Sequence, residues 1–181
     1  KLIVCASYYG FTHLKDGTAL VDATDGFGNT TTTVDPDATP GSGDEYEIYD
    51  NDFNLVNAFA EYGLEVGGQP LSIFVDYVSN SGADENNTGY IVGVTYGKID
   101  EPGQIKCGIA FQTLEADATV GALSNSDFGG GGTNSTGILA TFGVGLAEKT
   151  VLGVTYFANT IDPDGADTTY GRMQVDLKMK F

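Results

Sequence analysis

The sequence predicts an all-β chain whose antiparallel strands run up and down and close as a transmembrane β-barrel. Three observations support this fold class. Eight segments alternate apolar and polar residues with a period of two, long and short connections alternate between them, and one face of the segments carries almost no charge. The 181 residues suffice for one domain, so we expect residues 1–181 to form a single barrel domain or the C-terminal part of one. In the second case the complete barrel would have about 16 strands.

The eight predicted strands are separated by segments rich in turn and loop residues. The first covers residues 2–11, and we expect its outer face to carry Leu2, Val4, Ala6 and Tyr8. Residues 15–50 are rich in Gly, Thr and Asp and show no helical or strand period, so we expect a loop there. The other predicted strands cover residues 55–66, 71–77, 89–97, 104–112, 137–146, 152–156 and 170–181.

The connections between these segments alternate in length. Short turns are predicted near residues 67–70, 100–103 and 147–149, and longer polar loops lie between the other pairs of strands. Outer-membrane barrels combine short periplasmic turns with longer extracellular loops in this way. The first residues, Lys1 to Val4, enter a strand-like pattern directly, so we expect a processed chain or a part of a longer one.

The last predicted strand alternates up to the final residue. Successive side chains of a strand point to opposite faces. One face therefore carries Met173, Val175, Leu177, Met179 and Phe181, and the other carries Arg172, Gln174, Asp176, Lys178 and Lys180. A strand that alternates in this way and ends on Phe resembles the C-terminal signature of bacterial outer-membrane β-barrels.

The distribution of charge identifies the face that meets lipid. One face of the eight segments is almost free of charge, and the other carries most of the charged strand residues. Charged groups cannot line a dry core without partners, so the charged face is expected to line a wet or ion-paired lumen. The candidates for tuning selectivity there are Glu61, Asp76, Lys106, Arg172 and Asp176.

The chain is strongly acidic, with a formal net charge of -17. This charge argues against a nucleic acid as a partner. Of the 25 acidic residues, 18 fall in the four predicted long loops, which contain one basic residue, Lys15. Such a mouth would enrich cations and repel anions over about 8 Å at physiological salt. Alternatively, the acidic loops keep the outer surface soluble and bridge divalent ions of the lipopolysaccharide layer.

Other residue patterns give little sign of an enzyme or a cofactor. No Ser-His-Asp set or metal-ligand cluster is visible, and His13 has no Cys or His neighbours. We therefore expect no enzyme activity and no cofactor. Asp162, Asp164 and Asp167 are spaced like the start of a calcium loop but lack the downstream Glu, so a solvated turn is the alternative. Cys5 and Cys107 lie inside strand patterns and are expected to be free thiols.

Several segments together resemble the C-terminal half of the proteobacterial putative porin family. The resemblance covers most of residues 53–181 and is carried by residues 76–80, 88–94, 114–118, 126–133 and 152–181, of which the Asp-Phe-Gly-rich segment 126–133 is the most specific. It implies an outer-membrane barrel for passive diffusion of small hydrophilic solutes or ions. It also implies that Phe181, with Met179 and Leu177, marks the chain for the barrel-assembly machinery.

Alternatives to a channel remain open at this point. An eight-stranded barrel has a bore that side chains nearly fill, so a chain that closes alone could be a structural barrel that anchors or sheathes a partner protein. A soluble β-sandwich is a third reading. Membrane lipid and lipopolysaccharide are the partners that both barrel readings share, and a homo-oligomer is compatible with either.

Overall fold

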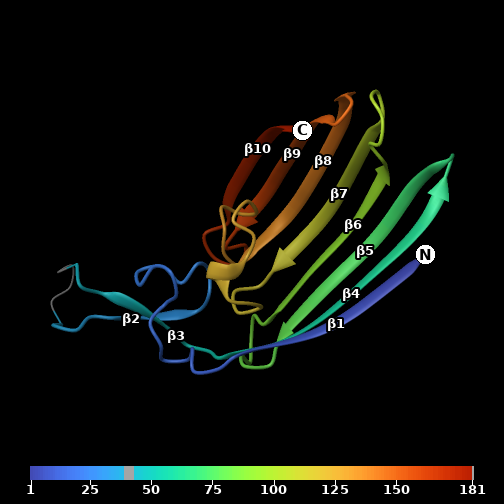
Figure 1. Ribbon diagram of the computed structural model, residues 1–181. Helices are drawn as coiled ribbons and strands as arrows, with labels where there is room; N and C mark the ends of the chain where they lie inside the picture. Colours follow the sequence, from blue (N-terminus) through green and yellow to red (C-terminus); the bar gives the residue numbers. More distant parts are fainter. Residues whose placement is uncertain (39–42, 181) are drawn as a thin grey trace.

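The computed structural model describes residues 1–38 and 43–180, and these residues form almost entirely β-structure (Figure 1). A single 3-10 turn, η1 (Gly121–Leu123), is the helical element within these ranges. The strands are β1 (Leu2–Phe11), β2 (Thr31–Val34), β3 (Tyr46–Tyr49), β4 (Phe53–Val66), β5 (Gln69–Asn80), β6 (Thr88–Gly97), β7 (Ile105–Leu114), β8 (Ser135–Ala147), β9 (Thr150–Ile161) and β10 (Thr168–Met179).

Eight of these strands form one antiparallel sheet in the order β1-β4-β5-β6-β7-β8-β9-β10. They correspond to the eight predicted segments, and each pairs with its predicted neighbours in an up-and-down arrangement. The prediction of an all-β up-and-down fold is confirmed.

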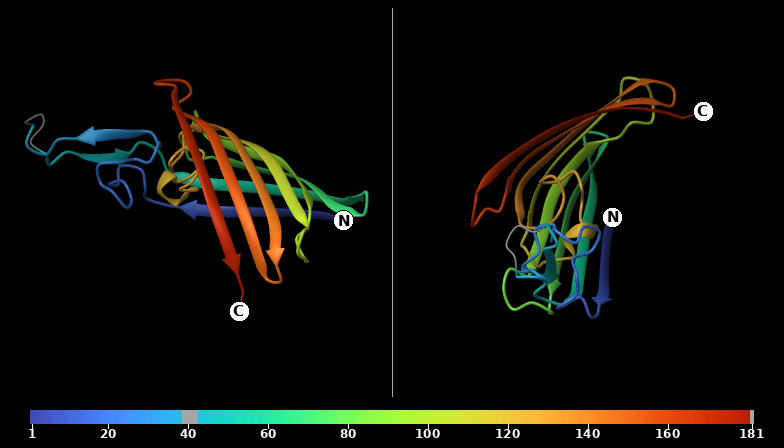
Figure 2. Two further views of the ribbon diagram at one scale, coloured as in Figure 1. Left: turned by 90° about the horizontal axis from the view of Figure 1, so that it is seen from above. Right: turned by 90° about the vertical axis from the view of Figure 1, so that its left-hand side faces the viewer.

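The sheet is not closed into a barrel, which corrects the expectation that these eight strands close on themselves. Within the described residues β1 pairs only with β4, and β10 pairs only with β9. The result is a twisted, curved wall with two free edges (Figure 2). Closure requires hydrogen bonds between the first and last strands, and those bonds are not formed between β1 and β10.

Residues 15–50, predicted to be a loop without strands, contain the hairpin β2-β3. Thr31 pairs with Tyr49 and Val34 with Tyr46, and isolated bridges join Lys15 and Thr18 to β3. The two strands have four residues each and, apart from Glu47, consist of β-branched and aromatic residues, which favour extended structure. They are too short for a period of two to stand out in the sequence.

The connections meet at two ends of the sheet. We call the end with the β4-β5, β6-β7 and β8-β9 connections the turn end, and the opposite end the loop end. The expected alternation of lengths holds only in part, because the loop 81–87 is as long as the turn 98–104 and the loop 162–167 is shorter than that turn. Each short turn still lies at the turn end, because every strand pair is antiparallel.

The strand register assigns each side chain to one of two faces. Direct cross-strand partners point to the same side of a sheet. The outer face is defined by a row of cross-strand partners that runs from β1 to β10. The row consists of Val4, Ala60, Val75, Val92, Phe111, Ile138, Ala158 and Gly171, and residues two positions away along each strand lie on the same face. This register places Leu2, Val4, Ala6 and Tyr8 on the outer face, as predicted.

The apolar side chains of the outer face are exposed. Val4 and Met173, near the two edges of the sheet, are both 68% exposed. The aromatic ring of Tyr90 contacts that of Phe111 at a centroid distance of 6.2 Å near the loop end. An apolar surface that extends over all eight strands has no counterpart in an ordinary soluble monomer.

The small core lies at the loop end and is made by loops as well as strands. Tyr49 and Phe53 are fully buried, and their rings meet edge to face at 5.7 Å. Val120, from the loop between β7 and β8, packs against the same cluster. The core therefore attaches the first long loop to the third.

Cys5 and Cys107 are free, as predicted, and both are exposed. Cys107 pairs with Tyr96 and Phe142 on the outer face, whereas Cys5 pairs with Phe59 on the opposite face.

Among the helical residues of the ranges 1–38 and 43–180, no helix has the length and apolarity needed to cross a membrane.

Candidate functional site

The face opposite the outer one, which we call the inner face, is crossed by the loop 115–134 at the loop end (Figure 2). Towards the β1 edge of the sheet, Val120 of this loop packs in the core beside β4. Towards the β10 edge, the backbone N–H of Gly129 donates a hydrogen bond to Asn159 Oδ1 of β9 at 3.2 Å. The loop therefore spans the mouth of the curved sheet from one edge region to the other.

Buried polar groups join this loop to its neighbours. Asn80, at the end of β5, is fully buried, and its Oδ1 accepts hydrogen bonds from the N–H groups of Asn54 and Gly82. Its Nδ2 donates to the carbonyls of Asp52 and Asp117 at 3.0 and 2.9 Å. One side chain thus satisfies backbone groups from three loops.

Asn29 and Asp117 extend the same network. Asn29 Nδ2 donates to the carbonyls of Ala116 and Thr119, and Asn29 Oδ1 accepts from the N–H of Gly121. The two carboxylate oxygens of Asp117 accept from the backbone N–H of Thr30 and from Asn51 Nδ2. A buried carboxylate is tolerated only when donors replace water, and both oxygens of Asp117 have one.

Replacing Asn80 by Ala is expected to make the loops more mobile without unfolding the sheet. The substitution removes the four hydrogen bonds of this buried side chain and leaves backbone groups without partners, at a cost of about 3 kcal/mol. Limited digestion with a protease that cleaves at acidic residues, which are abundant in the loops, should therefore cut the loops faster while the strands stay protected. Asn87→Ala removes one bond, to the carbonyl of Ala83 in the same loop, and serves as the control. Equal digestion of both variants would contradict the role of Asn80.

Arg172 connects the last strand of the sheet to the loop that crosses it. Its guanidinium contacts the Asp127 carboxylate at 3.0 Å, and both side chains are about a third or more exposed. Asp127 belongs to the segment 126–133 that carries the family resemblance. An ion pair this exposed contributes little stability, but it fixes the position of the loop over the inner face.

Arg172→Gln is expected to free the loop locally. Hydrogen exchange of the amides in residues 121–132 should accelerate several-fold, while global stability should change by less than about 1 kcal/mol because the pair is exposed. Lys178→Gln removes the same charge from the same face of β10 near the turn end and should leave exchange in the loop unchanged. Unchanged exchange in Arg172→Gln would show that the ion pair does not hold the loop.

All five predicted lumen residues lie on the inner face, but they do not form one cluster. Following the register, Glu61 and Arg172 occupy the same cross-strand row at opposite sides of the sheet, separated by Phe74, Gly93, Ala110, Leu139 and Phe157. Asp76 lies one inner position nearer the loop end, where Asn57 Nδ2 donates to its carboxylate. Lys106 and Asp176 share a row nearer the turn end.

The row of Lys106 is rich in glycine. Lys106 pairs with Gly97 on one side and Gly143 on the other, and Gly143 pairs with Gly153, the partner of Asp176. Because glycine has no side chain, these positions leave room beside the long lysine, and over Gly143 the side chain of Ile99 takes that room. Glu65 also belongs to this row, because it pairs with Pro70, which lies next to Gly97.

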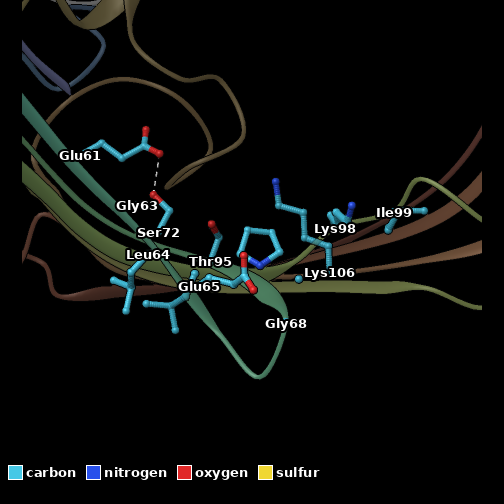
Figure 3. A pocket seen from close by; sticks show the side chains of 13 residues that line it. Glu61, Gly63, Leu64, Glu65, Gly68, Ser72, Thr95, Lys98, Ile99 and Lys106 are labelled. Carbon is cyan, nitrogen blue, oxygen red and sulfur yellow. Dashed lines mark hydrogen bonds between the residues drawn. The ribbon is translucent and has the colours of Figure 1, made fainter. Parts of the chain in front are cut away.

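A groove of about 930 Å³ opens on this part of the inner face (Figure 3). Glu61 and Lys106 line it from β4 and β7, with Ser72 and Thr95 between them. Ser72 Oγ donates to Glu61 Oε1 at 2.6 Å, which orients the carboxylate.

Lys98, in the turn after β6, is the second cation of the groove and is already paired. Its ammonium contacts the Asp100 carboxylate at 2.7 Å. The hydrogen bond and the charge of Asp100 raise the pKa of Lys98, and the charges of Glu101 and Glu65 add to this effect.

The structure gives Asp162 a local role. Its carboxylate accepts hydrogen bonds from Asn134 Nδ2 at 3.0 Å and from the N–H of Ala166 at 2.7 Å. Asp162, Asp164 and Asp167 do not form a set of mutually close ligand atoms. Within residues 1–38 and 43–180, the acidic set that does so is Asp35, Asp37 and Asp44, around the tip of the β2-β3 hairpin.

Residues that the sequence did not single out complete the site. Asn80, Asn29 and Asp117 hold the loops, Asp127 anchors Arg172, and Ser72 orients Glu61. Asn80, Asp117 and Asp127 stood in segments that the resemblance marked. The others are ordinary polar residues whose partners lie many residues away.

Residues 45–181 match the family model described as putative porin. No curated protein and no solved structure matches the chain.

Proposed function

The chain belongs to the putative porin family. From this premise we propose that it forms part of the wall of a channel in the bacterial outer membrane. Small hydrophilic solutes and ions would diffuse through the channel passively, along the inner face. The proposal involves no chemical step and no cofactor.

The observation that carries the proposal is the division of the sheet into two faces. The outer face is apolar over all eight strands and exposed, as a surface in contact with lipid must be. The inner face carries Glu61, Asp76, Lys106, Arg172 and Asp176, and the loop 115–134 narrows the space above it. Fixed charges along an aqueous path are the means by which pores select ions.

The free edges of β1 and β10 require further strands in a membrane. Backbone N–H and C=O groups cannot be left unpaired in lipid, so each edge must bond to another strand. β1 runs from the turn end to the loop end and β10 runs in the opposite direction. An antiparallel wall is therefore completed by an even number of further strands, from a longer chain or from a second copy, as a barrel of about 16 strands requires.

The loop end is proposed to face outward and to favour cations. It holds 18 of the 25 acidic residues, and this negative mouth attracts small cations and repels anions within about a Debye length. The same carboxylates would bind divalent cations that bridge them to lipopolysaccharide, and calcium at Asp162, Asp164 and Asp167 belongs to this proposal.

The turn end of β10 is proposed to carry the assembly signal. Leu177 and Met179 lie on the outer face there, more than half exposed. Phe181, the third residue of the predicted signal, lies outside the described residues. The barrel-assembly machinery is the partner that would read this apolar segment.

The decisive experiment records currents from the purified full-length protein in planar bilayers. We expect discrete conductance steps and, across a KCl gradient, a reversal potential that shows preference for K⁺. The double variant Asp84→Asn and Glu85→Gln, at exposed loop positions, should lower this preference by about twofold or less, because it removes only part of the loop charge. Glu101→Gln with Glu148→Gln removes two charges at the turn end and is the control. A bilayer without steps would refute the channel.

The assignment of the faces is tested by placing one charge on either side of β10. Val175→Arg puts a cation on the outer face, where it should cost about 2–4 kcal/mol near the middle of the membrane. Gln174→Arg puts the same cation on the inner face and should cost little. Folding into lipid vesicles, followed by urea titration, measures both. Equal costs would show that the outer face does not contact lipid.

A further inference from the structure

Two opposite charges of the groove near the turn end are not joined to each other. The Glu61 carboxylate and the Lys106 ammonium extend to the same side of the strands, with Ser72 and Thr95 between them (Figure 3). Among residues 1–38 and 43–180, no carboxylate oxygen lies within 4.0 Å of the Lys106 ammonium. The groove therefore holds a fixed anion and a fixed cation that can both accept a ligand.

The geometry of the sheet explains why Lys106 has no partner. Its two cross-strand neighbours, Gly97 and Gly143, have no side chains to contact it. The other lysine of the groove, Lys98, is paired with Asp100 in its own turn. The acidic side chains of the same row, Glu65 and Asp176, are each three strands away, or about 14 Å between backbones.

The floor between the two charges suits a small polar solute. The hydroxyls of Ser72 and Thr95 lie there, and Gly63 and Gly97 add no side chains that would fill the space. The Ser72 hydroxyl holds the Glu61 carboxylate in place through its 2.6 Å hydrogen bond. The volume of about 930 Å³ is in the range of pockets that bind small molecules.

We propose that this groove is a subsite for small zwitterionic solutes, whose carboxylate contacts Lys106 while the Glu61 carboxylate on the other side of the groove attracts their ammonium. The inference rests on the proposed channel and adds a solute class to it. A free anion would be repelled by the acidic loops before it reached Lys106, and a neutral solute would leave both charges unsatisfied. A solute with both charges and no net charge passes the loops and is attracted by both side chains.

The test compares alanine with lactamide, a neutral molecule of nearly the same size, in a liposome-swelling assay with the full-length protein. Wild-type protein should admit alanine at least about twofold faster than lactamide, because charged hydrogen bonds at the subsite raise its local concentration. Lys106→Gln and Glu61→Gln should each bring the ratio of the two rates to about 1. Lys149→Gln, which removes the same charge from the β8-β9 turn, should leave the ratio unchanged.

A charge-swapped variant separates binding from a general effect on pore shape. Glu61→Lys combined with Lys106→Glu keeps both charges in reversed order, so it should restore most of the alanine preference that either single variant loses. Equal rates for alanine and lactamide in the wild type would overturn the subsite and leave the channel standing. Swelling with neither solute would overturn the channel and the subsite together.

Discussion

Each functional feature of this protein depends on the register of one antiparallel ladder. Because cross-strand partners share a face, a slip of one residue between any two strands would move lysines and glutamates of the neighbouring strand to the apolar side. The register keeps Val4, on the first strand of the sheet, and Met173, on the eighth, on the same outer surface. It also brings Lys106 and Asp176 into one inner row with glycines between them. The charge pattern of the inner face is a consequence of this pairing.

The loops are organised by a different interaction, the burial of polar side chains that replace water for backbone groups. Three of these side chains are polar: those of Asn80, Asn29 and Asp117. Each is buried because its hydrogen-bonding atoms pair with N–H and C=O groups of other loops. The small core around Tyr49 and Phe53 adds apolar burial at the same end. Together they hold the loop 115–134 across the inner face, where Arg172 meets it from the last strand. The mouth is thus shaped by contacts among loops, and the strands supply the frame.

The sequence revealed the strands and their faces because a period of two is a local signal that survives over ten residues. It did not reveal β2 and β3, whose four residues each are too few to display a period. From charge and from the alternation of side chains along the strands, it also suggested five lumen residues. The register places all five on the inner face. It could not show that Glu61 is oriented by Ser72 or that Arg172 pairs with Asp127, because these partners are 11 and 45 residues apart in the chain. Contacts of that kind depend on how the strands and loops are placed in space.

By itself the sequence determined the all-β class, the order of the eight sheet strands and the side of the sheet that carries charge, since alternation fixes the direction of each side chain. Tertiary structure alone decided that the sheet stays open between β1 and β10, because closure depends on curvature and on hydrogen bonds between strands far apart in the chain. It also decided that the loop 115–134 folds over the inner face and that Lys106, beside two glycines, has no ionic partner among the described residues. With those three features, the sheet is an open wall whose inner face carries charged side chains and is partly covered by a loop.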